Sequence, residues 1–490
     1  MRSSSIFYLI SSVISGLSGF VLISILTKNF SPDAYGYYSL IITTVSLMVS
    51  VMIGWISQST IRFYEEISNE RKENEIVVTI LLTTISINLL LIIISILFSI
   101  AINNNSSFTS IKNFINLTSL LFFSESFYLL LSNILRAKNN SRFFAISVIL
   151  YTSLKLIFAI IYIIIDGDDI SLVIIGYSIS GFIVNLLIVF IQFKFQNLSL
   201  NYFSLDILRR FFKYGIPLMG LSTIQWVIAS SDRFIIGVYR NAKEVGLYSL
   251  SYSLASNVFS IITTFLLLTS YPKIISAMNK SGKEGAAVSI GIHLRYYILI
   301  ILPVFWGIFA LSENLLIFIS SDEYLEGRMT LIITSLSMVV YGFTFYYNKT
   351  WELSKDTKVI FVHSLFVGLL NVLLNILIVP RYGYNAAAYT TLISYILYLI
   401  ITVYRSKKKM KIVLEIKSLI KIFSASFLMF ICVRQYIGIL NDGIIHLIVA
   451  TLLGAIVYLL LLWLFKEISE EVKITKSFIR KIKNKFKNIY

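Results

Sequence analysis

Apolar residues occur in runs of about 20 from one end of the chain to the other, with short polar segments between them. A helix of that length spans the hydrocarbon core of a bilayer. Barrel strands would be about 10 residues long and would alternate in polarity, and runs such as Ile76–Ile102 do neither. The pattern predicts fourteen transmembrane helices, near residues 6–27, 39–60, 77–101, 113–135, 143–165, 170–193, 214–237, 246–271, 288–310, 329–348, 359–379, 385–404, 418–437 and 444–465.

A short phrase occurs twice in this pattern, as "AYGYYSL" at 34–40 and as "EVGLYSL" at 244–250, so that Gly36 and Gly246 stand 210 residues apart. Each copy stands at the start of a predicted span, one at the second and one at the eighth. Both of these spans are expected to run from the outside to the inside of the membrane. A second pair, "NSRFFAISV" and "DTKVIFVHS", follows the fourth and tenth spans. Two repeats of six helices share one orientation in the membrane, and such parallel repeats hold the substrate site between them.

The fold class that follows is an all-α polytopic membrane protein. The segment Ser204–Lys213 has apolar residues on one face, which predicts an amphipathic helix on the cytoplasmic surface. The predicted domains are an N-terminal six-helix lobe (1–198), a cytoplasmic linker helix (199–213), a C-terminal six-helix lobe (214–410), two additional transmembrane helices (411–465) and a basic cytoplasmic tail (466–490).

Composition agrees with a membrane location. Of the 490 residues 57% are hydrophobic and only 14% are charged, where a soluble protein has about one quarter charged. The net charge of +17 comes from basic residues on one side of the predicted helices, including "RSKKKMK" and the tail "KSFIRKIKNKFKNIY". The positive-inside rule then predicts cytoplasmic termini, so the charge is a topology signal and predicts no nucleic-acid partner. The lysine-rich tail predicts membrane lipids as partners. One cysteine, Cys432, and three scattered histidines show no metal-ligand spacing, so no metal or cofactor is predicted.

Three strings resemble one protein family. They are "SPDAYGYYSL", "SSDRFIIGVYRNAKEVGLYSLSYSLAS" and "NVLLNILIVPRYGYNAAAYTTLISY", and the chain is similar through them to the polysaccharide-biosynthesis flippases of the multidrug/oligosaccharidyl-lipid/polysaccharide exporter superfamily. The resemblance implies two lobes around a central cavity, two helices added at the side, and a bacterial inner-membrane location. It also implies transport of an undecaprenyl-diphosphate-linked oligosaccharide to the outer leaflet. Relatives in the superfamily move lipid II or export cationic drugs.

Ionisable residues within spans are functional-site candidates because their burial in a membrane is costly. Lys155 lies about 20 Å along its span from the cytoplasmic end, and Glu125 about 16 Å along the neighbouring span. Their similar depth predicts a pair. One interpretation is a structural ion pair, and the other is a lysine that binds the diphosphate with Glu125 as its resting partner or as a cation site.

Six further residues are substrate-binding candidates. Arg62 stands at the cytoplasmic end of the second span, where it is either a membrane anchor or a contact for the diphosphate. Arg295 stands near the start of the ninth span, where its side chain can also reach the lipid headgroups. Asp232 and Arg233 lie near the outer end of the seventh span, where a structural role is the alternative. Asn371 and Asn375 share a helix face, suited to bonding neighbouring helices or sugar hydroxyls.

A membrane-embedded polymerase or glycosyltransferase is the alternative from another class. The acidic cluster "DGDD" at 166–169 lies in an outer connection, and a four-residue turn leaves little room for a catalytic site. The chain is therefore predicted not to be an enzyme. A nucleotide-binding "GxxxxGK[ST]" is absent, so energy would come from an H+ or Na+ gradient, the membrane potential or substrate supply.

Overall fold

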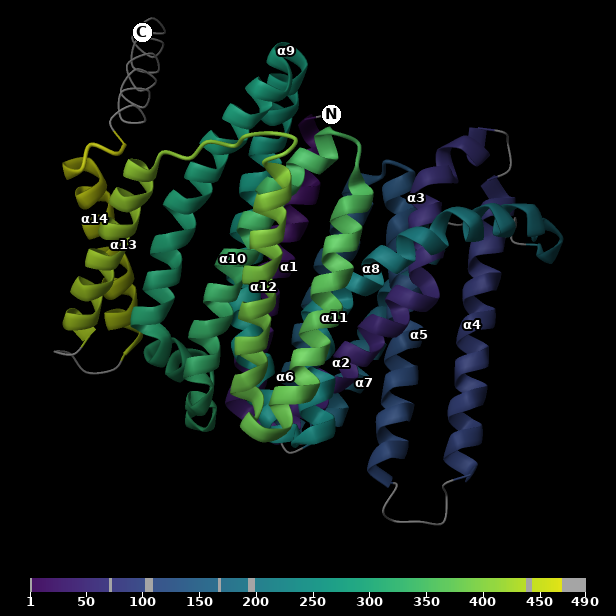
Figure 1. Ribbon diagram of the computed structural model, residues 1–490. Helices are drawn as coiled ribbons and strands as arrows, with labels where there is room; N and C mark the ends of the chain where they lie inside the picture. The colour runs from purple at the N-terminus through teal and green to yellow at the C-terminus, as the bar shows by residue number, and fades with distance from the viewer. Residues whose placement is uncertain are drawn as a thin grey trace, which may run out of the picture. The chain divides into compact units, whose positions relative to one another are not determined.

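The computed structural model describes residues 2–69, 73–101, 109–165, 169–192, 199–437 and 443–468 (Figure 1). Within these ranges the chain forms helices and no strand, which confirms the all-α class. The acidic turn at 166–168, most of "IGILND" and the tail from 469 onward lie outside the described residues. The helices are α1 (Arg2–Asn29), α2 (Pro32–Met48), α3 (Gly54–Asn69), α4 (Glu73–Ala101), α5 (Thr109–Ala137), α6 (Ser141–Ile165), α7 (Ile170–Gln192), α8 (Leu205–Tyr239), α9 (Ala242–Ile319), α10 (Arg328–Leu353), α11 (Thr357–Tyr382), α12 (Tyr384–Ser406), α13 (Ile416–Ile437) and α14 (Ile444–Leu464).

Twelve helices in these ranges are long and apolar enough to cross a membrane, so this is a multi-pass membrane protein. One of them, the 78-residue α9, is two helices joined at Ser281 and Gly282. Gly282 has φ +62°, a left-handed conformation that glycine adopts without steric cost. Since α9 contains two of the predicted spans and α8 contains another, the structure is consistent with about fourteen spans.

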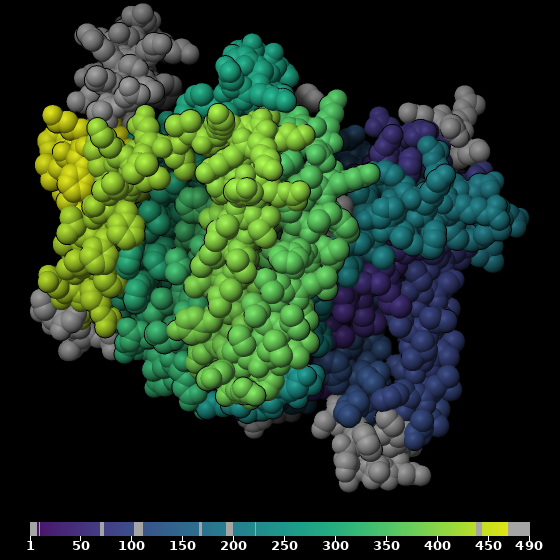
Figure 2. All heavy atoms as spheres, in the orientation of Figure 1, coloured from purple at the N-terminus to yellow at the C-terminus, as the bar shows by residue number. Residues whose placement is uncertain are grey.

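The helix α8 differs from its prediction because the linker helix and the seventh span are continuous. Ser204 caps the helix by accepting a hydrogen bond from the backbone N–H of Ile207 at 3.4 Å. Pro217 lies inside it, but no helix end precedes the proline. The first part of α8 runs crosswise to α4 and α5 (Figure 1) and lies over one end of α4 in Figure 2. Gly215 packs on α3 so closely that a β-carbon there would lie 2.2 Å from the Trp55 carbonyl oxygen.

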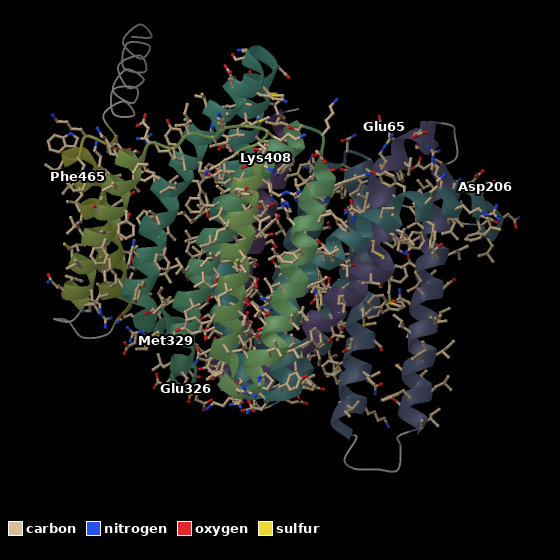
Figure 3. All side chains as sticks on the ribbon, in the orientation of Figure 1. Glu65, Asp206, Glu326, Met329, Lys408 and Phe465 are labelled. Atoms are coloured by element: carbon tan, nitrogen blue, oxygen red, sulfur yellow. The ribbon has the colours of Figure 1, made fainter. Side chains whose placement is uncertain are left out.

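The contacts divide the chain into two compact units. The first comprises Met1–Leu250, Ile319–Glu326 and Ser364–Thr390, and the second comprises Ser251–Phe318, Gly327–His363 and Thr391–Tyr490. These units cross the predicted lobe boundaries, which stay a prediction. In the first unit, Glu65 and Asp206 lie at one end and Glu326 at the other; in the second, Lys408 and Phe465 lie opposite Met329 (Figure 3). Residues from segments predicted to be cytoplasmic thus share one end of each unit.

The internal repeat is visible in local backbone structure. Asn139 and Lys355, which stand immediately before the two strings of the second repeated pair, both have left-handed backbones, with φ of 55° and 58°. The residue after each one donates a 2.9 Å backbone hydrogen bond back to the end of the preceding helix. The first pair agrees: Ser31 and Asn241 each cap a helix by accepting from the N–H three residues on, at 3.4 and 2.9 Å. Equivalent segments therefore adopt the same turns.

Candidate functional site

Lys155 and Glu125 form the predicted pair. The ammonium nitrogen of Lys155 in α6 lies 2.8 Å from Oε1 of Glu125 in α5. The hydroxyl of Tyr151, one helical turn before Lys155, donates to the same oxygen at 2.7 Å. The side chains of Lys155 and Glu125 are 20% and 26% exposed, so both are accessible although they lie within apolar helices.

Tyrosine rings surround the lysine. Its ammonium lies 4.1 Å from the ring centroid of Tyr151 and 5.3 Å from that of Tyr177 in α7. Tyr38 of α2 contacts Tyr177 edge-on at 6.0 Å. Aromatic faces attract a cation, and the attraction strengthens away from water. The sequence prediction named none of these rings, although the i, i+4 spacing of Tyr151 and Lys155 was a usable signal.

Asp232 is the centre of a second cluster, and it is fully buried. Nδ2 of Asn375 in α11 donates to its Oδ1 at 2.6 Å, and the hydroxyl of Tyr248 in α9 donates to its Oδ2. Asn375 also donates to Asn371 at 3.2 Å and accepts from Thr390 of α12 at 2.7 Å. Four helices therefore meet at one carboxylate and two amide groups.

Arg233 points to a different set of partners from its neighbour. Its Nε donates to the hydroxyl of Ser249 at 3.2 Å, and Nη1 donates to the Ala229 carbonyl at 3.1 Å. Ser249 also accepts a 2.7 Å hydrogen bond from Ser39 of α2. The sequence prediction missed Tyr248, Ser249 and Ser39, all of which belong to the repeated phrase.

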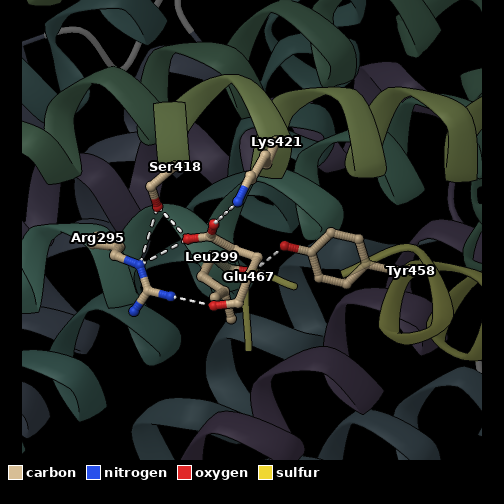
Figure 4. A network of polar contacts seen from close by, with 6 residues as sticks. All are labelled: Arg295, Leu299, Ser418, Lys421, Tyr458 and Glu467. Atoms are coloured by element: carbon tan, nitrogen blue, oxygen red, sulfur yellow. Dashed lines mark hydrogen bonds and ion pairs between the residues drawn. The ribbon is translucent and has the colours of Figure 1, made fainter. Parts of the chain in front are cut away.

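Arg62 and Arg295 stand apart from both clusters. Arg62, 57% exposed, lies 3.7 Å from Glu66, and Glu66 also pairs with Arg210. Arg295 belongs to the second compact unit, where its Nε donates to Oε1 of Glu467 at 2.9 Å and its Nη2 donates to the Glu467 carbonyl at 2.7 Å (Figure 4). In this conformation Arg295 holds the segment that follows α14.

The Glu467 carboxylate has two further partners. Ser418 of α13 donates to Oε1, and the Lys421 ammonium lies 3.6 Å from Oε2 (Figure 4). Of the eight predicted site residues, the structure thus brings together Lys155 with Glu125, and Asp232 with Asn371 and Asn375. Arg233 adjoins the second group.

The two clusters of the first unit differ in what they can do chemically. The Lys155 ammonium has three donors and can exchange one carboxylate for another anion. The Asp232 cluster offers a carboxylate with amide and hydroxyl oxygens, which suits a proton or a small hard cation. Among the described residues, no group of three or more His, Cys, Asp or Glu could hold a metal ion.

Comparisons with known proteins give a family and a fold. The family described as polysaccharide biosynthesis protein matches residues 25–328. The solved structure of the lipid II flippase MurJ in an inward closed conformation has a TM-score of 0.75 at 19% identity, covering 96% of this chain and 100% of that one. An inward-facing multidrug resistance MATE family transporter of the MOP superfamily has a TM-score of 0.56 at 13% identity, covering 81% of this chain and 93% of that one. Comparison with curated protein sequences gives no match.

Proposed function

Because this chain belongs to the polysaccharide biosynthesis protein family, we propose that it is a flippase for an undecaprenyl-diphosphate-linked oligosaccharide. The cargo would be a repeat unit of an O-antigen, capsule or exopolysaccharide. Transport would run from the cytoplasmic to the outer leaflet of a bacterial inner membrane by alternating access. The protein would act as a transporter and not as an enzyme. Its fold, shared with a lipid flippase, supports this reading.

The observation that carries the proposal is the environment of Lys155. A diphosphate has about two negative charges, and moving it through hydrocarbon without cations would be prohibitive. Lys155 supplies a cation inside an apolar helix, and a single carboxylate oxygen accepts its hydrogen bond. The diphosphate can take the place of that carboxylate, and the tyrosine faces keep the ammonium oriented meanwhile.

The alternatives have less support from the site. A cation-drug exporter needs accessible acidic residues, whereas Glu125 is already neutralised by Lys155. Lipid II carries the same diphosphate, so only the identity of the transported glycan distinguishes that alternative from the proposed cargo. A polymerase or glycosyltransferase needs carboxylates at an aqueous face, and the fully buried Asp232 does not meet that need.

Asp232 is our candidate for the coupling-ion site. Its buried carboxylate accepts hydrogen bonds from Asn375 and Tyr248, and a proton or Na+ bound there would neutralise its charge. The oxygens of Asn371 and Thr390 lie in the same hydrogen-bonded cluster. Asp232→Asn should therefore remove the dependence of transport on the H+ or Na+ gradient, which transport measurements with each gradient imposed in turn would reveal.

The proposed topology has both termini in the cytoplasm. With Cys432 replaced by serine, a cysteine at Asn385, beside the α11–α12 turn, should react with an impermeant thiol reagent added to intact cells. A cysteine at Lys408 should react only after the membrane is opened. The reverse labelling would refute this orientation.

The decisive experiment is reconstitution in vesicles with an undecaprenyl-diphosphate-linked oligosaccharide. Wild-type protein should make the sugar accessible on the far leaflet, and Lys155→Gln should not. Lys280→Gln, which removes an exposed lysine, is the matched control and should keep activity. In cells that lack the protein, the lipid-linked sugar that accumulates on the cytoplasmic side identifies the glycan. Movement of lipid II in preference to the oligosaccharide would overturn the proposed cargo.

A further inference from the structure

A cluster of nitrogen donors lies in the second compact unit, where α10 and α12 end and α11 begins. Nη1 of Arg405 in α12 lies 3.0 Å from Nε2 of His363 in α11. The His363 ring meets the indole of Trp351 in α10 edge-on, with ring centroids 6.3 Å apart. The ammonium of Lys409, just after α12, lies 6.0 Å from the centre of that indole. We call Trp351, His363, Arg405 and Lys409 the donor cluster.

The charge of Arg405 is not balanced within the cluster. A guanidinium only donates hydrogen bonds, so Nε2 of His363 is the acceptor and the neutral ring carries its proton on Nδ1. Within the described residues Arg405 forms no ion pair with a carboxylate, whereas Arg295 has Glu467. The carboxylate of Asp356 lies 3.9 Å from the Lys409 ammonium. Arg405 therefore keeps a positive charge for an anion from outside the chain.

Two further donors of the cluster lack an acceptor. Nδ1 of His363 and Nε1 of Trp351 are buried and have no hydrogen-bond partner among the described residues. The two side chains are only 3% and 5% exposed. Buried polar groups are nearly always hydrogen-bonded, so these two donors indicate an acceptor that the chain itself does not supply.

The fold does not require the donor cluster. The left-handed turn at Lys355 recurs at Asn139 in the first repeat. Counted from those two residues, the positions of Trp351 and His363 correspond to Leu135 and Ser147 in the first repeat, and that of Arg405 corresponds to Ile191 near the end of α7. Since the turn is present in both repeats and the donors in only one, the donors serve something other than the turn.

The surroundings of the cluster are basic at the helix end and apolar along the helix. Lys407, Lys408 and Lys411 are exposed beside it, and Lys408 lies at the end of the second unit opposite Met329 (Figure 3). The Lys408 ammonium is 5.9 Å from the centre of the Tyr404 ring. From there an exposed apolar stripe continues along α12 at intervals of three or four residues, formed by Tyr404, Ile400, Ile396 and Ile393.

We propose that the donor cluster binds the phosphate of an anionic phospholipid, whose acyl chains lie along the α12 stripe. Basic pockets between transmembrane helices bind anionic headgroups, and the paired donors of a guanidinium suit a phosphate. Arg405 and Lys409 contact the phosphate, and His363 positions the guanidinium. The bound headgroup lies in the cytoplasmic leaflet if the proposed topology holds. The site is independent of the proposed cargo.

A binding measurement tests the proposal. Purified full-length protein in a neutral detergent is titrated with short-chain phosphatidylglycerol, and bound lipid is counted by native mass spectrometry. Arg405→Gln should weaken the binding of one lipid by about tenfold or more, because a charged hydrogen-bond donor is lost. Arg434→Gln, which removes an exposed arginine of α13 with the same change in charge, is the matched control and should bind as wild type does. Equal affinity in wild type and Arg405→Gln would overturn the site.

Two further variants keep the test independent of how well Arg405→Gln folds. Lys409→Gln alters a side chain that is 42% exposed, and it should also weaken lipid binding. His363→Gln keeps an acceptor for Arg405 and an N–H donor, so its affinity should stay close to that of wild type, whereas His363→Leu should lose affinity. Wild-type affinity in Lys409→Gln would overturn the phosphate contact, and equal affinity in the two His363 variants would overturn the positioning role.

Competition identifies the source of the phosphate. Inorganic phosphate should not displace phosphatidylglycerol, because it has no acyl chains to lie along α12. Phosphatidylcholine should compete poorly, because its choline balances the phosphate charge. Displacement by inorganic phosphate would make the ligand a free anion and overturn the lipid. Since no lipid-linked sugar is present in these measurements, their failure would leave the proposed flippase function standing, and lipid binding without transport would support the site and refute that function.

Discussion

Two ion pairs of this protein, one in each compact unit, have almost the same length and very different surroundings. Lys155 lies 2.8 Å from Glu125, and Arg295 lies 2.9 Å from Glu467. The guanidinium of Arg295 holds a carboxylate and a backbone carbonyl together, and the Glu467 side chain is only 6% exposed. The Lys155 ammonium bonds one oxygen of a 26% exposed carboxylate.

The difference teaches that distance alone does not identify a binding site. A planar guanidinium with two acceptors in place is preorganised and gives up its partner reluctantly. An ammonium with one acceptor and two aromatic faces can exchange that acceptor for a phosphate oxygen at small cost. We therefore propose that Lys155 exchanges Glu125 for the phosphate of the substrate, and that Arg295 with Glu467 attaches the segment after α14. The following predictions can break or sharpen that assignment.

Removing the lysine charge should have the largest effect. Lys155→Gln should lower the transport rate by about 100-fold, equivalent to about 3 kcal/mol for a lost charged contact. Lys155→Arg keeps the charge and should retain part of the activity. Rates are measured in vesicles and normalised to membrane protein. A Lys155→Gln protein with wild-type transport would remove Lys155 from the site.

The double change Lys155→Ala with Glu125→Ala separates a site from a structural pair. If the pair only stabilises the fold, removing both charges restores abundance and transport, because neither charge is left unpartnered. Our assignment predicts restored abundance without restored transport. Membrane abundance and vesicle transport are compared for the two single variants and the double variant. Full activity of the double variant would contradict the assignment.

The second pair should affect stability and leave transport intact. Glu467→Gln leaves the Arg295 charge without its carboxylate partner, at a cost of about 2 kcal/mol in the free energy of unfolding. The thermal unfolding midpoint in detergent should fall, while transport per folded molecule stays unchanged. If transport is lost while the unfolding midpoint is unchanged, the role of Arg295 is substrate binding and not attachment of the segment after α14.

The smallest effect is expected at Arg62. Its pair with Glu66 is exposed, and such pairs contribute little to stability, so Arg62→Gln should leave the unfolding midpoint unchanged. If Arg62 contacts the diphosphate at the cytoplasmic side, transport at low substrate concentration should fall while the maximal rate holds. Equal substrate dependence in wild type and variant would make Arg62 a membrane anchor only.

Sequence reasoning succeeded where one helix or one helix pair carried the information. The apolar runs predicted the spans because backbone groups in lipid must be bonded within a helix. The pairing of Lys155 with Glu125 followed from depth along two consecutive helices. The continuity of α8 was missed because the amphipathic pattern of Ser204–Lys213 changes to an apolar pattern after Lys213, which suggested two separate helices. Pro217 lies inside the continuous helix, as proline can where neighbouring helices satisfy the freed backbone groups.

The amino-acid sequence by itself determined the all-α class, the membrane location and the internal repeat, since each depends on residue type and spacing along the chain. Only the tertiary structure decided that Asp232 meets Tyr248 and Asn375, because those residues come from three separate helices. It also decided that Gly36 meets Gly246. A sequence repeat states that two segments are equivalent, but whether equivalent segments touch depends on where the axis between them passes.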